Sequence, residues 1–170
     1  VRQHPGRDLA VFRNWYRQAG TPRVTVKLDH DAAARRVTVT LSQECQPVGV
    51  EKKKAPAGFV KAPYHIPFAI GLLDRDGRAL PLRHEGAVKD TALLELTTQT
   101  QQWHFDGIDA LPVPSLLRDF SAPVIVDYDW TDEELALLSA HDGNPFARWE
   151  AGQELATRQI LSLADARQAG

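Results

Sequence analysis

Residues 65–82 contain two apolar segments separated by the turn sequence Asp-Arg-Asp-Gly at 74–77. Asp favours turns, and Gly adopts positive φ at no steric cost, so this stretch predicts a β-hairpin. The first arm is apolar on both faces, which is typical of a strand at the centre of a sheet. Pro67 cannot donate to the ladder and indicates a bulge or a strand start. We expect Leu80 and Leu82 of the return arm to point inward.

Alternation of apolar and polar residues recurs on both sides of this hairpin and indicates half-buried strands. We expect loops at Gln46–Pro63 and around Pro112 and Pro114, where turn-forming residues interrupt the alternation. About seven short strands within roughly 105 residues favour an immunoglobulin-like antiparallel β-sandwich over a barrel. The further strands are expected near 23–28, 37–42, 91–98, 102–105 and 124–128.

Helical periodicity replaces the alternation at both ends of the chain. Asp8–Ala19 predicts a helix that Gly20 ends. Thr131 and Glu134 form a capping-box pattern that begins a second helix. Asn144, followed by Pro, caps a third helix, whose uncovered apolar stripe favours self-association. The expected stripe consists of Phe146, Trp149, Ala156, Ile160 and Leu163.

The overall composition is ordinary, with 43% hydrophobic and 25% charged residues and a net charge of −2. This balance predicts neither a nucleic-acid partner nor a membrane partner, because neither sign of charge is in large excess. The single cysteine, Cys45, has no disulfide partner in the chain, so we expect a reducing, cytoplasmic location. We expect Cys45 to be a small buried apolar residue whose neighbours, Glu44 and Gln46, offer no cation.

Candidate metal ligands do not form a complete pattern. His84-Glu85 begins like a zinc-protease HExxH motif, but Val88 occupies the position of the second histidine. His104 lies on a predicted strand and is expected to be a surface histidine or a hydrogen-bonded one rather than a metal ligand. An EF-hand is excluded because Asp132 and Leu138 replace its required Gly and Glu. The densest acidic cluster, which we assign to helix N-terminal acids, comprises Asp127, Asp129, Asp132, Glu133 and Glu134.

The run Glu51–Lys54 contains three of the lysines of the predicted 46–63 loop. A basic patch for nucleic acid would interleave aromatic residues, which this run lacks, so we interpret it as a solvated loop. No GxSxG, Walker A or GxGxxG sequence occurs in the chain. We therefore predict no catalytic, cofactor-binding or metal-binding residue.

Three long stretches cover nearly the whole chain in order: Phe12–Val26, Tyr64–Leu82 and Pro112–Gln153. Several short patterns within them are specific, namely W-Y-x-Q-x-G-T-P, H-I-P-F, R-D-F-S-A-P-V and N-x-F-x-R-W. Together these stretches closely resemble the bacterial M1 family of zinc metallopeptidases. The loop from Cys45 to Pro63 departs from the family by being longer and richer in lysine.

The resemblance implies a multidomain enzyme that removes N-terminal amino acids from peptides by means of a zinc ion. The family's HExxH, its distant zinc-binding Glu, its GAMEN motif and its catalytic tyrosine have no counterpart here, so no site residue is transferred. Residues 1–20 would be the tail helix of the catalytic domain, 21–129 the β-sandwich domain, and 130–170 the first helices of a C-terminal α-helical domain.

Two hypotheses of different classes follow. In the first, the chain is a non-catalytic structural segment of a zinc-dependent aminopeptidase, inactive alone, and its partners are the missing catalytic and helical domains. The start at Val1, the lack of methionine and the helical pattern near Gly170 agree with a segment of a longer protein. In the second, the chain is an independent immunoglobulin-like module that binds another protein.

Overall fold

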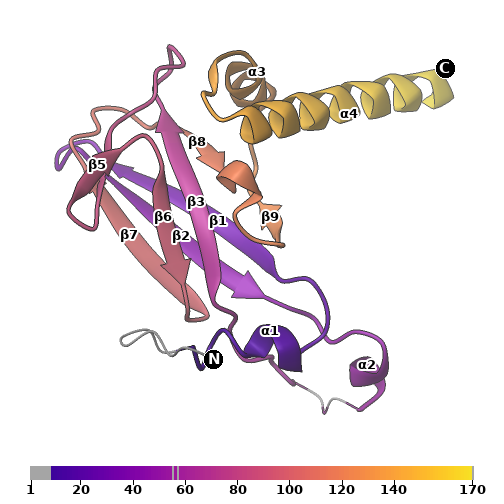
Figure 1. Ribbon diagram of the computed structural model, residues 1–170. Coiled ribbons are helices and arrows are strands. Elements are labelled where there is room, and N and C mark those ends of the chain that lie inside the picture. The colour runs from indigo at the N-terminus through magenta and orange to yellow at the C-terminus, as the bar shows by residue number, and fades with distance from the viewer. Residues whose placement is uncertain (1–8, 55, 57, 170) are drawn as a thin grey trace.

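The computed structural model describes residues 9–54, 56 and 58–169, and two β-sheets form a sandwich with helices at both ends (Figure 1). The elements are α1 (Asn14–Arg17), β1 (Arg23–Asp31), β2 (Arg36–Glu44), α2 (Val50–Lys54), β3 (Ile66–Leu73), β4 (Leu82–His84), β5 (Ala87–Lys89), β6 (Ala92–Leu96), β7 (Thr100–Asp106), β8 (Val113–Leu116), the short 3-10 turn η1 (Arg118–Phe120), β9 (Ile125–Asp127), α3 (Asp132–His141) and α4 (Pro145–Ala169). The sheets have the orders β7-β2-β1-β9 and β6-β3-β8, and β4-β5 forms a separate ribbon. All paired strands are antiparallel except β1 and β9, which are parallel.

The core lies between the two larger sheets. In the first half of β1 and along β2, every second side chain is buried, as the alternation predicts. In β3 all residues except Pro67 are buried, and β3 has β6 on one side and β8 on the other. The predictions of a mainly β sandwich and of a central strand in 65–82 are therefore confirmed. Tyr64, Phe68 and Phe105 are the largest side chains that are fully buried.

The predicted hairpin forms its turn but does not continue as a ladder. Gly77 has a φ of +82°, as the turn requires. The return arm contacts β3 through one bridge, Leu73–Ala79, and one bond from the Leu80 amide to the Leu72 carbonyl. It separates there because β6 already occupies that edge of β3 from Ile66 to Ile70. The chain then forms the β4-β5 ribbon, in which Leu82 is buried as predicted and Leu80 is half-buried.

The described part of the chain forms nine strands, whereas about seven were predicted. The additional strands are β5 and β8. The expected loop around Pro112 and Pro114 was wrong, because Val113–Leu116 pairs with the end of β3. β8 lies at the edge of its sheet, where a proline without an N–H is tolerated.

The predicted helix Asp8–Ala19 was wrong in extent. Only α1 is helical, and Asp8 lies outside the described residues. Side chains of α1 bind the backbone of residues 63–65 instead of facing solvent. Asn14 Nδ2 donates to Pro63 O at 2.7 Å, and Trp15 Nε1 donates to His65 O at 2.9 Å. These long-range bonds override helix propensity.

The expected 46–63 loop contains a short helix, α2, which the sequence analysis did not predict. Lys52, Lys53 and Lys54 are all exposed, which agrees with a solvated segment. Gly20 has a φ of +96°, but the prediction that it ends the helix was wrong, because α1 ends at Arg17 and Gln18 is its C-cap.

The C-terminal helices begin where the sequence predicts. The Thr131 hydroxyl accepts a bond from the Glu134 amide, and the Glu134 carboxylate accepts one from the Thr131 amide, which is a complete capping box. Asn144 caps α4 by accepting a bond from the Ala147 amide at 3.0 Å. α3 and α4 lie at the end of the sandwich opposite to α1 and α2, and α4 projects away from it (Figure 1).

The face of α4 that contacts the sandwich is not the predicted apolar stripe. The buried residues are Ala147 and Ala151, whose small side chains allow the helix to approach closely. Trp149, Ile160 and Leu163 of the predicted stripe are 60%, 65% and 70% exposed. The stripe is therefore an outer surface of this chain.

Candidate functional site

The junction between the sandwich and the C-terminal helices is built around Arg118, which is 4% exposed. Its guanidinium donates from Nε to Ser115 Oγ at 2.8 Å and from Nη1 to both Asp90 O and Thr91 Oγ1 at 2.9 Å. From Nη2 it donates to Asp142 Oδ1 at 2.9 Å, and Asp142 is fully buried. Arg118 thus connects β8, the segment before β6 and the link between α3 and α4.

The backbone around Arg118 is shaped for this contact. A Cβ on Gly71 would lie 2.1 Å from Arg118 Cζ, so only glycine in β3 leaves room for the guanidinium. Leu117, Asp119 and Phe120 have φ values of 51°, 57° and 50°, a left-handed conformation that non-glycine residues adopt at a cost. The surrounding contacts must therefore determine this conformation.

Asp142 connects the Arg118 junction to the start of α4 by hydrogen bonds. Its Oδ1 also accepts a bond from the Asn144 amide at 2.8 Å, while its backbone carbonyl accepts two bonds from the Arg148 guanidinium. Asn144 Nδ2 donates to Asp119 Oδ1 at 2.8 Å. The start of α4 is therefore hydrogen-bonded both to the buried Asp142 and to η1.

A second contact joins α3 to the sandwich. Trp130 Nε1 donates to Pro114 O at 3.0 Å, and Glu134, almost fully buried, accepts a bond from Arg75 Nη1 at 3.3 Å. A Cβ on Gly77 would lie 2.5 Å from His141 Cβ, so the 74–77 turn packs directly against the end of α3. Leu73, Val113, Leu135, Leu138 and Ala151 form a separate apolar cluster beneath these contacts.

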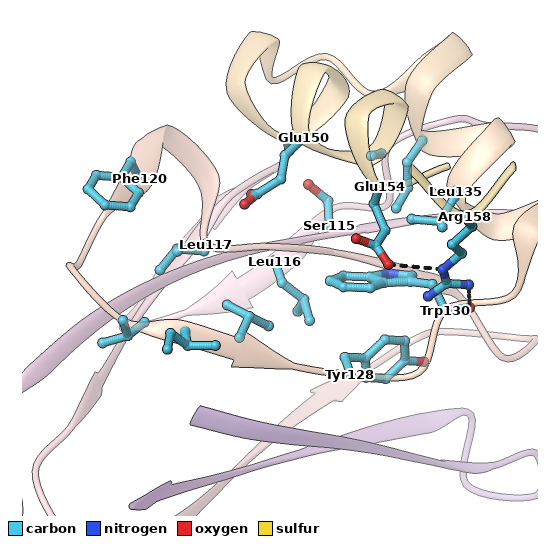
Figure 2. Close-up of a pocket in the computed structure, with 16 residues that line it drawn as sticks. Ser115, Leu116, Leu117, Phe120, Tyr128, Trp130, Leu135, Glu150, Glu154 and Arg158 are labelled. Carbon is cyan, nitrogen blue, oxygen red and sulfur yellow. Dashed lines mark hydrogen bonds and ion pairs between the residues drawn. The ribbon is translucent and has the colours of Figure 1, made fainter. Parts of the chain in front are cut away.

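A cleft of about 360 Å³ lies between the sandwich and α4 (Figure 2). Its floor is apolar and includes Leu116 and Leu117, while Tyr128 and Trp130 lie at one end and Phe120 at the other. Burial, followed by the charge of Glu134, raises the pKa of Tyr128 to about 12, so its phenol stays protonated at neutral pH.

α4 places charged groups above this floor. Glu154 accepts a bond from Arg158 Nε at 2.9 Å, and Arg158 also donates to Trp130 O at 2.8 Å. Glu150 projects from the previous turn over the same floor (Figure 2), and no hydrogen bond or ion pair from a described residue reaches its carboxylate. Burial and the charge of Glu154 raise the pKa of Glu150 above its ordinary value.

The N-terminal end of the sandwich has its own cluster, centred on the almost fully buried Lys61. Lys61 Nζ lies 2.7 Å from Glu51 Oε2 and donates to the Ala19 carbonyl. The hydrogen bond from Lys61 is the main reason that the pKa of Glu51 is lowered. This cluster holds α2 against the segment that follows α1.

Cys45 lies in this same cluster and is half-buried, so the expectation of a buried cysteine was wrong. Its sequence neighbours Glu44 and Gln46 offer no cation, as expected, but Lys61 Nζ, from a distant part of the chain, lies 3.8 Å from its Sγ. Tyr64 Oη donates to Cys45 Sγ at 3.6 Å, and burial raises the pKa of that phenol.

The structure does not bring the other candidate residues together as a site. His84 Nε2 contacts Leu93 O at 3.0 Å, and His84 and Glu85 lie at the turn of the β4-β5 ribbon rather than on a helix. His104 is exposed and its Nδ1 contacts Thr38 Oγ1, as expected of a surface histidine. Asp132 forms an ion pair with Arg158.

The family resemblance implies zinc for the whole enzyme, and zinc requires a set of His, Cys, Asp or Glu ligands. Among residues 9–54, 56 and 58–169, no group of three or more His, Cys, Asp or Glu side chains could hold a metal ion. Within the same residues, no helix is long and apolar enough to cross a membrane.

Sequence reasoning did not identify Arg118, Gly71, Asp142 or Glu150. The ion pair between Arg118 and Asp142 joins residues 24 positions apart, and neither periodicity nor a capping pattern reports such a contact. The only signal was that Arg118 opens the R-D-F-S-A-P-V pattern quoted for the family resemblance.

The chain is similar in sequence to proteins named aminopeptidase N. Aminopeptidase N of Escherichia coli is 41% identical to the chain over 153 residues, which are 90% of this chain and 17% of that protein. Aminopeptidase N of Caulobacter vibrioides is 44% identical over 94% of this chain and 17% of its own length. The chain therefore spans about one sixth of the length of these relatives.

A solved structure agrees with this result. The crystal structure of Legionella pneumophila aminopeptidase A in complex with aspartic acid matches 94% of this chain and 16% of its own chain, with a TM-score of 0.73 and 26% identity. Residues 132–170 match the family DUF3458_C, described as ARM repeats. Residues 20–129 match the domain of unknown function DUF3458, described as having an Ig-like fold, and the chain belongs to this family.

Proposed function

We propose that the chain is a non-catalytic structural segment of a zinc-dependent aminopeptidase, in which the sandwich links a catalytic domain to a C-terminal helical domain. Relatives named aminopeptidase N, 35–44% identical over at least 90% of the chain, support the enzyme class. Their greater length supports the presence of other domains as partners. The peptide substrates and the zinc would belong to those other domains.

The buried contact between Arg118 and Asp142 carries the proposed linking role. It joins two parts of the chain that match different families, because Arg118 lies within the Ig-like match and Asp142 within the ARM-repeat match. A buried, hydrogen-bonded ion pair in which each partner depends on the other resists displacement of one part against the other. The sandwich can thereby set the position of the first repeat helices.

The division into domains is part of this proposal. Residues 1–20 would end the catalytic domain, 21–129 would form the sandwich, and 130–170 would begin the helical domain. Trp130 supports a boundary near this position, because its indole binds β8 while its carbonyl binds Arg158 of α4. We also propose a cytoplasmic location, for which the single cysteine is the support.

Aminoacyl-anilide hydrolysis tests the proposal with two proteins, the 170-residue chain and the full-length polypeptide that contains it. With added zinc, the full-length protein should hydrolyse the substrate and lose activity to a chelator, whereas the chain alone should give no turnover. Turnover by the chain would overturn its non-catalytic role. A full-length protein without peptidase activity would overturn the enzyme class and favour an independent interaction module.

A further inference from the structure

A row of aromatic side chains begins at Phe120, which lies at one end of the cleft. The ring centroids of Phe120 and Phe146 are 5.6 Å apart, and those of Phe146 and Trp149 are 6.3 Å apart. Phe120 is 55% exposed and Trp149 is 60% exposed. Single exposed aromatic residues need no explanation, but three in contact form the kind of patch that marks an interaction surface.

The strained backbone of η1 maintains this exposure. Arg118 points into the protein and is 4% exposed, while Phe120, two residues later, points outward. Phe120 adopts a positive φ, as do Leu117 and Asp119. Strained non-glycine residues concentrate at functional positions, where the rest of the structure holds them in place. The direction of the Phe120 ring is therefore set before any partner arrives.

An unpaired carboxylate borders the aromatic row. Phe146, Trp149 and Glu150 are spaced three and four residues apart and so share one face of α4. Glu154 has Arg158 as its counter-ion, whereas no described residue pairs with Glu150. Partial burial, followed by the charge of Glu154, raises the pKa of Glu150, so a cation beside this carboxylate would favour its ionised form.

Aromatic rings beside a carboxylate form a site for arginine. A guanidinium stacks on aromatic faces and at the same time forms a forked contact with a carboxylate. A neighbouring apolar side chain of the same partner would fill the floor at Leu116 and Leu117. Charge and shape together thus favour a partner segment that carries an arginine next to an apolar residue.

We propose that Phe120, Phe146, Trp149 and Glu150, the aromatic–acidic surface, dock a segment of the same polypeptide outside residues 1–170 that presents an arginine beside an apolar residue. This inference rests on the proposed function, because the relatives of the chain are about six times its length. The docked segment would cover the cleft and fix α4 at a second point, in addition to Arg118.

Photo-crosslinking in the full-length polypeptide tests the proposal. Phe120 is replaced by benzoylphenylalanine, and Val88, which is 52% exposed on the β4-β5 ribbon, is replaced in the control. The Phe120 position should give one intramolecular crosslink, at least five-fold stronger than the control, to a peptide with an arginine within a few residues. A crosslink between two copies, a peptide without a basic residue, or no crosslink would each overturn the proposal.

A charge reversal separates docking from folding. Glu150→Arg should lower the crosslink yield at least five-fold, and a second reversal of the crosslinked arginine to Glu should restore it. Glu133→Arg, on the exposed side of α3, is the matched control and should leave the yield unchanged. Equal yields in all variants would overturn the role of Glu150. Anilide hydrolysis measured on the same samples reports separately on the proposed function.

Discussion

The two ends of the sandwich are joined to their neighbouring helices in different ways. At the C-terminal end, a buried guanidinium makes four hydrogen bonds, and two capped helices begin at defined residues. At the N-terminal end, α1 has four residues, none of them buried, and contacts the chain through side-chain bonds to the backbone of residues 62–65.

The two kinds of contact differ in the free energy that is lost when one partner is removed. An unpaired charge left inside the protein is strongly unfavourable, whereas a half-buried donor or acceptor that loses its partner regains water. The C-terminal junction should therefore hold its geometry in the chain alone. The attachment of α1, unlike the buried Lys61–Glu51 pair near it, should depend more on whatever covers Phe12, which is 40% exposed, and Tyr16, which is 83% exposed.

Arg118→Ala should produce the largest loss of stability. It leaves the fully buried Asp142 carboxylate without its cation, and breaking one side of a buried ion pair costs about 3–5 kcal/mol. Urea unfolding followed by tryptophan fluorescence measures the change. Arg36→Ala, which removes an exposed arginine paired with Asp106, is the control and should change little. Similar losses of unfolding free energy in both variants would show that the buried Arg118–Asp142 pair stabilises the fold no more than an exposed ion pair does.

Trp15→Phe tests the N-terminal end and should have a smaller effect. The change keeps the ring beside Tyr64, 4.6 Å between centroids, but removes the bond from Trp15 Nε1 to His65 O. A hydrogen bond of this kind contributes about 0.5–1.5 kcal/mol. The free energy of unfolding should fall by that amount, whereas Tyr16→Phe should leave it unchanged. A loss as large as that of Arg118→Ala would remove the distinction between the two ends.

The same difference decides what could be predicted from sequence. Alternation identified β1 and β2 because burial on one face repeats every second residue, whereas a run that is apolar on both faces identified β3. The caps at Thr131 and Asn144 were found because their partners lie three residues away. Local patterns therefore predicted most elements and the start of each C-terminal helix.

Contacts between distant residues were not predictable in this way. Asp8–Ala19 has a helical pattern, yet the bonds of Asn14 and Trp15 to residues 63 and 65 determine its structure. On α4 the large apolar residues suggested the wrong face, because close approach to the sandwich selects Ala147 and Ala151. Glu150 carried no signal at all, since its importance lies in having no hydrogen-bond or ion-pair partner among the residues that the structure describes.

The smallest effects on stability are expected for two glutamates, one at each end of the sandwich. Their substitution by glutamine should shift the urea midpoint in opposite directions. Glu51 at the N-terminal end has a lowered pKa, chiefly through its hydrogen bond with Lys61, so its ionised form stabilises the fold. That contribution is fully present above the ordinary glutamate pKa of about 4.3 and is lost as the pH falls through the lowered value. Glu51→Gln should therefore lower the urea midpoint at neutral pH, and the difference from the unchanged chain should vanish in acid.

Glu150→Gln should do the opposite in the 170-residue chain. Because burial and Glu154 raise the pKa of Glu150, its ionisation opposes folding above that raised value and has no effect below about pH 4.3, where both states are protonated. The variant should raise the midpoint at neutral pH and match the unchanged chain in acid. Urea titrations at several pH values measure both variants. If both variants lowered the midpoint, Glu150 would already have a counter-ion within the chain. The contrast with Glu51, which is paired with the buried Lys61, would then fail.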